Sequence, residues 1–290
     1  MVKPLFTGVC TALVTPFINN EINYPLLDRL IQRQIDAHIP AVVLAGTTGE
    51  SPVLSDMEKL TLFKRGKEYA KDECLVIAGT GSNSTEHAVA LSKAAEAVGV
   101  DALLIVAPYY NKGNADSLYR HFASIANAVK IPVILYNVPS RTGVDIPVEV
   151  YSRLSRIPNI AGVKEASSDI TKISKIRNAC SNNFCIWSGN DDQIVPVISL
   201  GGKGVISVLS NVYPEQTNIM AHAALSGDYA TASKLQCNMT ELIGLLFNEV
   251  NPIPVKYALQ HVGFDCGSCR LPLGPPSAAL AQKIDNYFTA

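Results

Sequence analysis

Eight short apolar runs follow one another along the chain, and they constrain its fold more than any other feature of the sequence. Each run is nearly continuous in Val, Ile, Leu and Ala, a pattern typical of parallel strands that are buried on both faces. We therefore predict eight parallel strands. They span residues 10–17, 41–49, 75–81, 102–110, 133–139, 160–166, 184–191 and 204–211.

Amphipathic segments separate the predicted strands, so the chain repeats a strand–helix unit. The clearest of these segments are residues 24–38, 55–71, 85–98 and 115–129. Ser55 and Ser84 stand at expected helix N-caps, and Glu58 completes a capping box with Ser55. Eight such units fit a (β/α)8 TIM barrel. A doubly wound sheet is the competing fold, but it has fewer parallel strands and an opening glycine-rich fingerprint that the sequence lacks.

The strand pattern ends at residue 211, and helical spacing takes its place. The predicted helices of this last part span residues 214–225, 229–247, 254–262 and 277–288. We therefore divide the chain into a (β/α)8 catalytic barrel over residues 1–225 and a small C-terminal helical domain over residues 226–290.

The composition limits the expected partners and location of the protein. Of its 290 residues, 48% are hydrophobic and 17% are charged, which is enough apolar material for a large core. The net charge of −1 provides no basic field for nucleic acid or an anionic membrane, so small molecules are the expected partners. Residues 1–17 lack the apolar core of a signal peptide, and no run approaches the roughly 18 residues that cross a bilayer. We predict a cytoplasmic enzyme.

The carboxyl ends of the predicted strands carry the candidate catalytic groups, because barrel enzymes assemble their active sites there. These ends supply Thr47, Thr48, Tyr109, Tyr110, Tyr136, Arg141 and Lys164. Lys164 is the most informative, since it lies within an apolar strand where an unpaired ammonium would be costly, although most lysines lie in solvent. Burial favours the neutral amine, the form that attacks a ketone to give an imine. We predict that Lys164 is a covalent catalytic residue.

Imine chemistry needs proton transfer, and Thr47, Tyr110 and Tyr136 carry hydroxyls that both donate and accept hydrogen bonds. Core packing explains any single tyrosine equally well, but three hydroxyls at neighbouring strand ends favour a shared site. Gly46 and Gly49 flank Thr47 and Thr48 and allow a turn whose N–H groups bind a carboxylate.

Arg141 is placed on the loop after the fifth strand. Its guanidinium suits a bidentate contact with the carboxylate of a second substrate, whereas a surface or interface ion pair is the competing interpretation. The stretch GGKG at residues 201–204 precedes the last strand and is better explained as a tight turn than as a phosphate site.

Metal and cofactor chemistry is not expected. The five histidines have no ligand spacing, so a metal-dependent aldolase is disfavoured. Cys266 and Cys269 form a lone CxxC, which lacks a second pair, and we predict that they are structural or surface thiols.

Three motifs resemble those of the dihydrodipicolinate synthase family. They are GTTGE at residues 46–50, YNVPSRTG at 136–143 and GVKEA at 162–166. Two stretches in the tail, NPIPVK at 251–256 and RLPL at 270–273, extend the resemblance over essentially the whole chain. The GTTGE turn and the lysine are shared with the wider superfamily, whereas Arg141 in its motif points to the synthase.

The resemblance implies condensation of pyruvate with L-aspartate 4-semialdehyde to 4-hydroxy-tetrahydrodipicolinate, the first committed step of lysine and diaminopimelate biosynthesis. Lys164 would form the imine with pyruvate, whose carboxylate would rest on the backbone amides of Thr47 and Thr48. Tyr136 would be the acid and base, and Arg141 would hold the carboxylate of the semialdehyde.

Further implied roles concern proton relay and assembly. Thr47 and Tyr110 would relay the proton, with Tyr110 reaching in from a neighbouring subunit, and Gly189 and Ile206 would line the site. The family's usual form is a homotetramer built as a dimer of dimers, so the resemblance implies the same assembly here.

The family also has a lysine feedback site, of which this sequence keeps Ser51, Asn83 and Tyr109. It departs from lysine-sensitive members at four positions, where Ala, His, His and Glu are replaced by Pro52, Asp56, Lys59 and His87. An added ammonium and a lost carboxylate weaken the binding of a cation. We predict weak or absent inhibition by L-lysine.

Two alternatives stay open. An N-acetylneuraminate or 2-keto-3-deoxy-sugar-acid lyase of the same superfamily would share Lys164, Tyr136 and the glycine turn, and Arg141 argues against it. A non-catalytic barrel would have lost its strand-end polar groups, and in this sequence every one is present.

Overall fold

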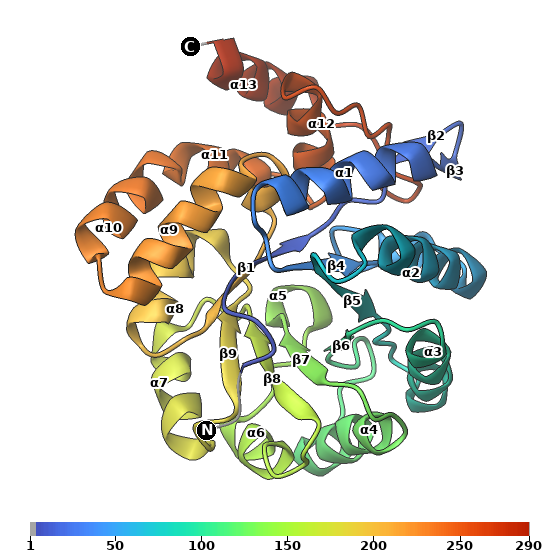
Figure 1. Ribbon diagram of the computed structural model, residues 1–290. Coiled ribbons are helices and arrows are strands. Elements are labelled where there is room, and N and C mark those ends of the chain that lie inside the picture. The colour runs from blue at the N-terminus through green and yellow to red at the C-terminus, as the bar shows by residue number, and fades with distance from the viewer. Residues whose placement is uncertain (1–3, 290) are drawn as a thin grey trace.

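Eight parallel strands close into a barrel in the computed structural model, which describes residues 4–289 (Figure 1). They are β1 (Gly8–Ala12), β4 (Ala41–Leu44), β5 (Leu75–Gly79), β6 (Ala102–Val106), β7 (Val133–Asn137), β8 (Ile160–Glu165), β9 (Cys185–Ser188) and β10 (Gly204–Ser207). Consecutive strands pair in parallel, and β10 closes the ring on β1. The predicted (β/α)8 fold is confirmed.

Each predicted strand is present, but each is shorter than its apolar run because the runs extend into the turns and loops beside the strands. The clearest error concerns Phe17, which was predicted to end the first strand. It belongs to a separate antiparallel hairpin, formed by β2 (Phe17–Ile18) and β3 (Glu21–Ile22). Asn19 and Asn20 make the two-residue turn of this hairpin with φ values of 51° and 66°. Positive φ at both positions is what a type I′ hairpin turn requires.

Helices surround the barrel, as Figure 1 shows. They are α1 (Tyr24–Asp36), α2 (Asp56–Ala70), α3 (Thr85–Ala97), α4 (Ala115–Asn127), α6 (Val148–Leu154), α7 (Ile170–Ala179), α8 (Ile194–Ser199) and α9 (Pro214–Ser226). The short helix α5 (Pro139–Thr142) lies inside this ring of helices in Figure 1. The short 3-10 helices are η1 (Ser51–Val53), η2 (Asp191–Gln193) and η3 (Leu209–Asn211). Ser55 and Glu58 form the predicted capping box at the start of α2, and Ser84 caps α3.

The barrel interior is filled by its own apolar cluster, distinct from the layer between strands and helices. Trp187 lies at the centre of this interior cluster with no exposed surface, and its ring stacks on Phe6 with centroids 4.7 Å apart. Burial of each large side chain of this kind stabilises the fold by roughly 1.5–3 kcal/mol. Because apolar side chains fill the barrel interior, we expect the polar groups of a functional site at the ends of the strands.

The C-terminal region consists of α10 (Tyr229–Asn238), α11 (Thr240–Leu246), α12 (Ile253–His261) and α13 (Ala278–Thr289). The single helix predicted over residues 229–247 is wrong, because Met239 has φ −90° and ψ −3° and separates two helices. Phe264, which follows α12, packs under the guanidinium groups of Arg29 and Arg33 of α1.

The division into a barrel over residues 1–225 and a helical domain over residues 226–290 stays a prediction, and residues 1–3 and 290 lie outside the described part of the chain. Over residues 4–289, no helix combines the length and the apolar character needed to cross a membrane.

Candidate active site

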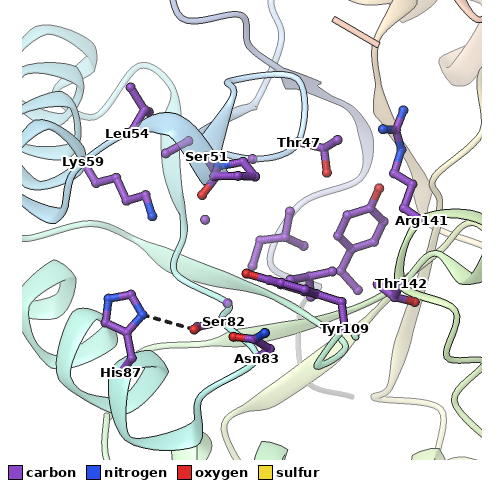
Figure 2. A pocket seen from close by; sticks show the side chains of 18 of the residues that line it. Thr47, Ser51, Leu54, Lys59, Ser82, Asn83, His87, Tyr109, Arg141 and Thr142 are labelled. Carbon is purple, nitrogen blue, oxygen red and sulfur yellow. Dashed lines mark hydrogen bonds between the residues drawn. The ribbon is translucent and has the colours of Figure 1, made fainter. Parts of the chain in front are cut away.

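A cavity of about 580 Å³ opens at the carboxyl ends of the strands (Figure 2). The loops after β4, β5, β6 and β7 contribute most of its polar lining. Six predicted site residues meet there: Thr47, Ser51, Asn83, Tyr109, Tyr136 and Arg141. The other predicted residues lie deeper in the barrel, behind the turn after β4, or in solvent.

Lys164 lies near the carboxyl end of β8, directly beside Tyr136 of β7 in the strand register. Both side chains are buried, with 5% and 6% of their surface exposed. The Lys164 Nζ lies 4.5 Å from the centroid of the Tyr136 ring, and it forms no ion pair within residues 4–289. A buried amine that forms no ion pair, next to a phenol, is suited to nucleophilic chemistry with proton transfer.

Gly189 borders the lysine from the loop after β9, and Ile206 lies in β10. A Cβ atom at Gly189 would lie 3.2 Å from Lys164 Cε and 2.6 Å from Ala166 Cβ. Glycine at this position therefore leaves the space that the lysine side chain occupies. Ile206 is fully buried and belongs to the interior cluster that also contains Tyr136.

The turn after β4 has an unusual backbone, with Ala45 at φ 50° and Glu50 at φ 58°. Non-glycine residues rarely adopt such angles, and they concentrate at functional sites. Within residues 4–289, the N–H groups of Thr47 and Thr48 donate to no acceptor. The Thr48 hydroxyl accepts a hydrogen bond of 2.9 Å from Asn251 Nδ2. The turn thus presents two free donors of the kind that bind a carboxylate.

Arg141 lies in the short helix α5, and its exposed side chain reaches the rim of the cavity (Figure 2). The buried Thr142 fixes the loop. Its hydroxyl lies within hydrogen-bond distance of two carbonyl oxygens, 3.1 Å from that of Val138 and 3.0 Å from that of Val144. Tyr110 is the predicted catalytic residue that stands apart. Its side chain is 84% exposed and its φ is 75°, and it does not line the cavity.

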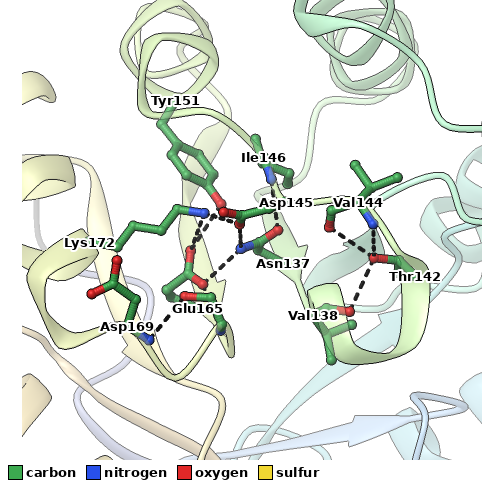
Figure 3. A network of polar contacts seen from close by, with 11 residues as sticks. Asn137, Val138, Thr142, Val144, Asp145, Ile146, Tyr151, Glu165, Asp169 and Lys172 are labelled. Atoms are coloured by element: carbon green, nitrogen blue, oxygen red, sulfur yellow. Dashed lines mark hydrogen bonds and ion pairs between the residues drawn. The ribbon is translucent and has the colours of Figure 1, made fainter.

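A polar network, buried except at Asp145, lies behind the two strands that carry Tyr136 and Lys164 (Figure 3). We call its five residues the Glu165 network: Asn137, Asp145, Tyr151, Glu165 and Lys172. Glu165 accepts hydrogen bonds from Asn137 Nδ2 at 2.8 Å and from the Tyr151 hydroxyl at 3.0 Å. Lys172 forms an ion pair with Asp145, and its Nζ lies 3.8 Å from Glu165.

Sequence reasoning missed the Glu165 network, although strand alternation offered a signal. Successive side chains of a strand point to opposite faces, so an inward Lys164 implies an outward Glu165. A buried outward carboxylate then needs a cation from the helical layer, which Lys172 of α7 supplies.

A second wall of the cavity is formed by α2 and α3, from which Lys59 and His87 reach inward (Figure 2). Lys59 is 7% exposed, and burial lowers its pKa while the nearby Asp56 opposes that shift. Asp56 lies 2.8 Å from His87 Nε2. The predicted residues of the lysine site, Ser51, Asn83 and Tyr109, line the same part of the cavity.

The seven cysteines are free thiols. Burial raises the pKa of Cys266 and Cys269 to about 12, so both thiols are protonated at neutral pH. Over residues 4–289, no group of three or more His, Cys, Asp or Glu side chains is arranged to hold a metal ion.

The closed parallel barrel and its buried lysine define the class of the protein. It is a (β/α)8 barrel whose strand-end cavity adjoins an unpaired amine, the arrangement of lyases that use a catalytic lysine side chain.

Comparisons with known proteins identify the family within this class. Residues 5–290 match the model of the dihydrodipicolinate synthetase family, and the chain belongs to this family. The 4-hydroxy-tetrahydrodipicolinate synthase of Acetivibrio thermocellus is 46% identical over 273 residues, covering 94% of this chain and 93% of the relative.

Solved structures of the family have the same fold. The enzyme from Cyanidioschyzon merolae, solved with lysine bound, is 38% identical with a TM-score of 0.96, covering 99% of this chain and 98% of the other. The chloride-inhibited Acinetobacter baumannii enzyme, complexed with pyruvate, is 37% identical with a TM-score of 0.95, and 98% of each chain is covered.

Proposed function

We propose that this protein condenses pyruvate with L-aspartate 4-semialdehyde to give 4-hydroxy-tetrahydrodipicolinate, the first committed step of lysine and diaminopimelate biosynthesis. The observation that carries the proposal is the buried, unpaired amine of Lys164 beside Tyr136 in a barrel of this family. A curated relative with this activity in its name shares 46% of its residues with the chain.

The reaction begins with attack of the neutral Lys164 amine on the carbonyl carbon of pyruvate. Water leaves and an imine forms, which acts as an electron sink for the neighbouring methyl group. The N–H groups of Thr47 and Thr48 hold the carboxylate of pyruvate, as their lack of other acceptors supports. In the A. baumannii relative, the solved complex contains pyruvate itself.

Loss of a methyl proton turns the imine into an enamine, and Tyr136 serves as the acid and base for this step. The enamine carbon attacks the aldehyde carbon of the semialdehyde, a C–C bond forms, and the aldehyde oxygen takes up a proton. The amino group of the semialdehyde then attacks the imine carbon, which releases Lys164 and closes the ring. Arg141 at the cavity rim holds the carboxylate of this second substrate.

Completion of the proton relay requires a second subunit. Thr47 lines the cavity, whereas Tyr110 projects into solvent with 84% of its side chain exposed. We propose that Tyr110 enters the site of a neighbouring subunit and that the enzyme is a homotetramer built as a dimer of dimers. An exposed tyrosine at a strained backbone position is the kind of group that a subunit contact orders.

A coupled assay tests the proposal directly. Purified protein is mixed with both substrates, and the product is followed through an NADPH-dependent dihydrodipicolinate reductase. We expect turnover that Lys164→Ala abolishes, together with borohydride trapping of pyruvate on the wild-type lysine. Trapping without turnover would instead favour the sugar-acid lyases, the reading that Arg141 and the family relatives disfavour.

A further inference from the structure

Glu50 is a buried carboxylate for which the proposed reaction has no use. It closes the Gly46–Glu50 turn with φ 58°, and its side chain is 1% exposed. A residue with a Cβ persists in this conformation only where its surroundings hold it there. The groups that hold Glu50 therefore also determine the shape of the turn.

The ammonium and the backbone N–H group that contact the Glu50 carboxylate both come from the C-terminal region. Lys256 of α12 places its Nζ 2.7 Å from Glu50 Oε1 and is 3% exposed. The backbone N–H of Arg270 donates to Glu50 Oε2 at 2.9 Å, across 220 residues of sequence. The Arg270 guanidinium continues past the turn and donates to Glu58 Oε1 at 2.6 Å. We call Glu50, Lys256 and Arg270 the Glu50 cluster.

A second contact from the same region acts on the turn itself. Asn251 is buried and donates its 2.9 Å hydrogen bond to the hydroxyl of Thr48, one of the two residues with free N–H groups. The barrel contributes a hydrogen bond from the Thr15 hydroxyl to the carbonyl oxygen of Gly49 at 2.7 Å.

A purely stabilising role does not explain the Glu50 cluster well. The desolvation of two buried charges offsets most of their attraction, so an apolar pair of the same shape would stabilise the fold at least as well. A charged pair does, however, fix direction. The Phe17 ring contacts both cations, with Lys256 Nζ 4.3 Å and Arg270 Cζ 4.4 Å from its centroid, so it joins the Lys256–Glu50 pair to the Arg270–Glu58 pair.

We propose that Asn251, Lys256 and Arg270 are positioning residues of the carboxylate-binding turn, so that the C-terminal helical region takes part in pyruvate recognition. The inference rests on the proposed function, because it assigns the purpose of the turn from that reaction. It predicts that loss of the contacts made by these three residues impairs the use of the first substrate and not of the second.

Lys256→Met tests the inference, since it keeps the size of the side chain and leaves Glu50 without its cation. We expect kcat/KM for pyruvate to fall roughly ten- to hundredfold, while KM for the semialdehyde at saturating pyruvate stays within twofold. Asn251→Ala, which removes one hydrogen bond to Thr48, should give a smaller fall in the same parameter. It serves as the test if Lys256→Met does not fold, as judged by circular dichroism.

Asp285→Asn is the matched control, because it loosens the same helices without touching the turn. Asp285 accepts a 2.9 Å hydrogen bond from the Tyr257 hydroxyl and lies 3.0 Å from His261 Nε2. We expect its melting temperature to fall and its KM for pyruvate to stay at the wild-type value. An equal KM change in the control and in Lys256→Met would overturn the inference, since the effect would then be general loosening.

Borohydride trapping separates this inference from the proposed function. The rate at which pyruvate is trapped on Lys164 needs no second substrate, and it should fall in Lys256→Met as kcat/KM falls. Normal trapping and normal kinetics in that variant would overturn the inference alone. A wild-type protein that is not trapped at all would overturn the proposed function and this inference with it.

Discussion

The two sides of the candidate site are supported by different means. Behind Lys164, the Glu165 network joins residues 137–172, which belong to consecutive strand–helix units of the barrel. Behind the Gly46–Glu50 turn, the Glu50 cluster joins one loop of the barrel to segments more than 200 residues later. Each side places a buried glutamate against a buried lysine, Glu165 with Lys172 and Glu50 with Lys256.

The difference shows what each kind of backbone needs. A strand end is already fixed by its hydrogen-bonded neighbours, so a local network only has to neutralise the outward Glu165. A turn with left-handed φ at Ala45 and Glu50 has no ladder to hold it. It therefore depends on groups from elsewhere in the chain.

The strongest test of the comparison removes the cation of the barrel side. Lys172→Met leaves the 3% exposed Glu165 without a countercharge, and breaking a buried pair in this way costs about 3–5 kcal/mol. We expect urea unfolding to show a loss of this size, with Lys64→Met as a control because its pair with Glu68 is exposed. Equal midpoints for the two variants would mean that the Glu165 network does not support the strands.

A smaller effect on stability is expected from the ion pair between Arg270 and Glu58. The hydrogen bond from Arg270 lowers the pKa of Glu58 from its ordinary value of 4.5 to about 2. A depressed folded-state pKa stabilises the protein above pH 4.5, and this contribution is lost as the pH falls through 2.

Glu58→Gln isolates this contribution, because glutamine has no charge but can still complete the capping box with Ser55. A partly exposed ion pair contributes about 1 kcal/mol to the free energy of unfolding. We therefore expect the variant to melt roughly 2–4 °C below wild type at pH 6. The difference should disappear near pH 2. A constant difference between pH 6 and pH 2 would show that the lost group acts through packing and not through its charge.

The smallest effect concerns ligand binding at the wall formed by α2 and α3. Lys59 and His87 occupy it, and a cationic ligand would meet the Lys59 ammonium. We expect no half-inhibition of activity by L-lysine at sub-millimolar concentration. The reversal variant Lys59→His/His87→Glu should bind lysine more tightly in calorimetry, and tight binding by the wild type would contradict the prediction.

The barrel was predictable because its strands are buried on both faces and therefore continuous in apolar residues. Lys164 was predictable for the same reason, since a cation inside such a run stands out. The ends of the strands were not predictable, because the residues that follow them, such as Leu13 and Ala45, are as apolar and as buried as the strands themselves. A break at Met239 leaves the helical spacing on both sides intact, so periodicity could not locate it.

The residues that hold the candidate site in place were harder to predict than the site residues themselves. Lys172 lies on an amphipathic helix where a lysine normally faces solvent, and its burial depends on the position of Glu165. The tail motifs at residues 251–256 and 270–273 were visible in the sequence without a role. Their pairing with Thr48 and Glu50 is a long-range contact, which no local pattern encodes.

The separation between Glu50 and Arg270 has a consequence for synthesis on the ribosome. All barrel strands have been translated by Ser207, but the backbone donor of Arg270 follows roughly 60 residues later. At about 5–20 residues per second, that delay lasts on the order of 3–13 s. A nascent chain can therefore assemble its barrel while the turn after β4 lacks an anchor, and a segment translated well after the barrel completes the first loop of the site.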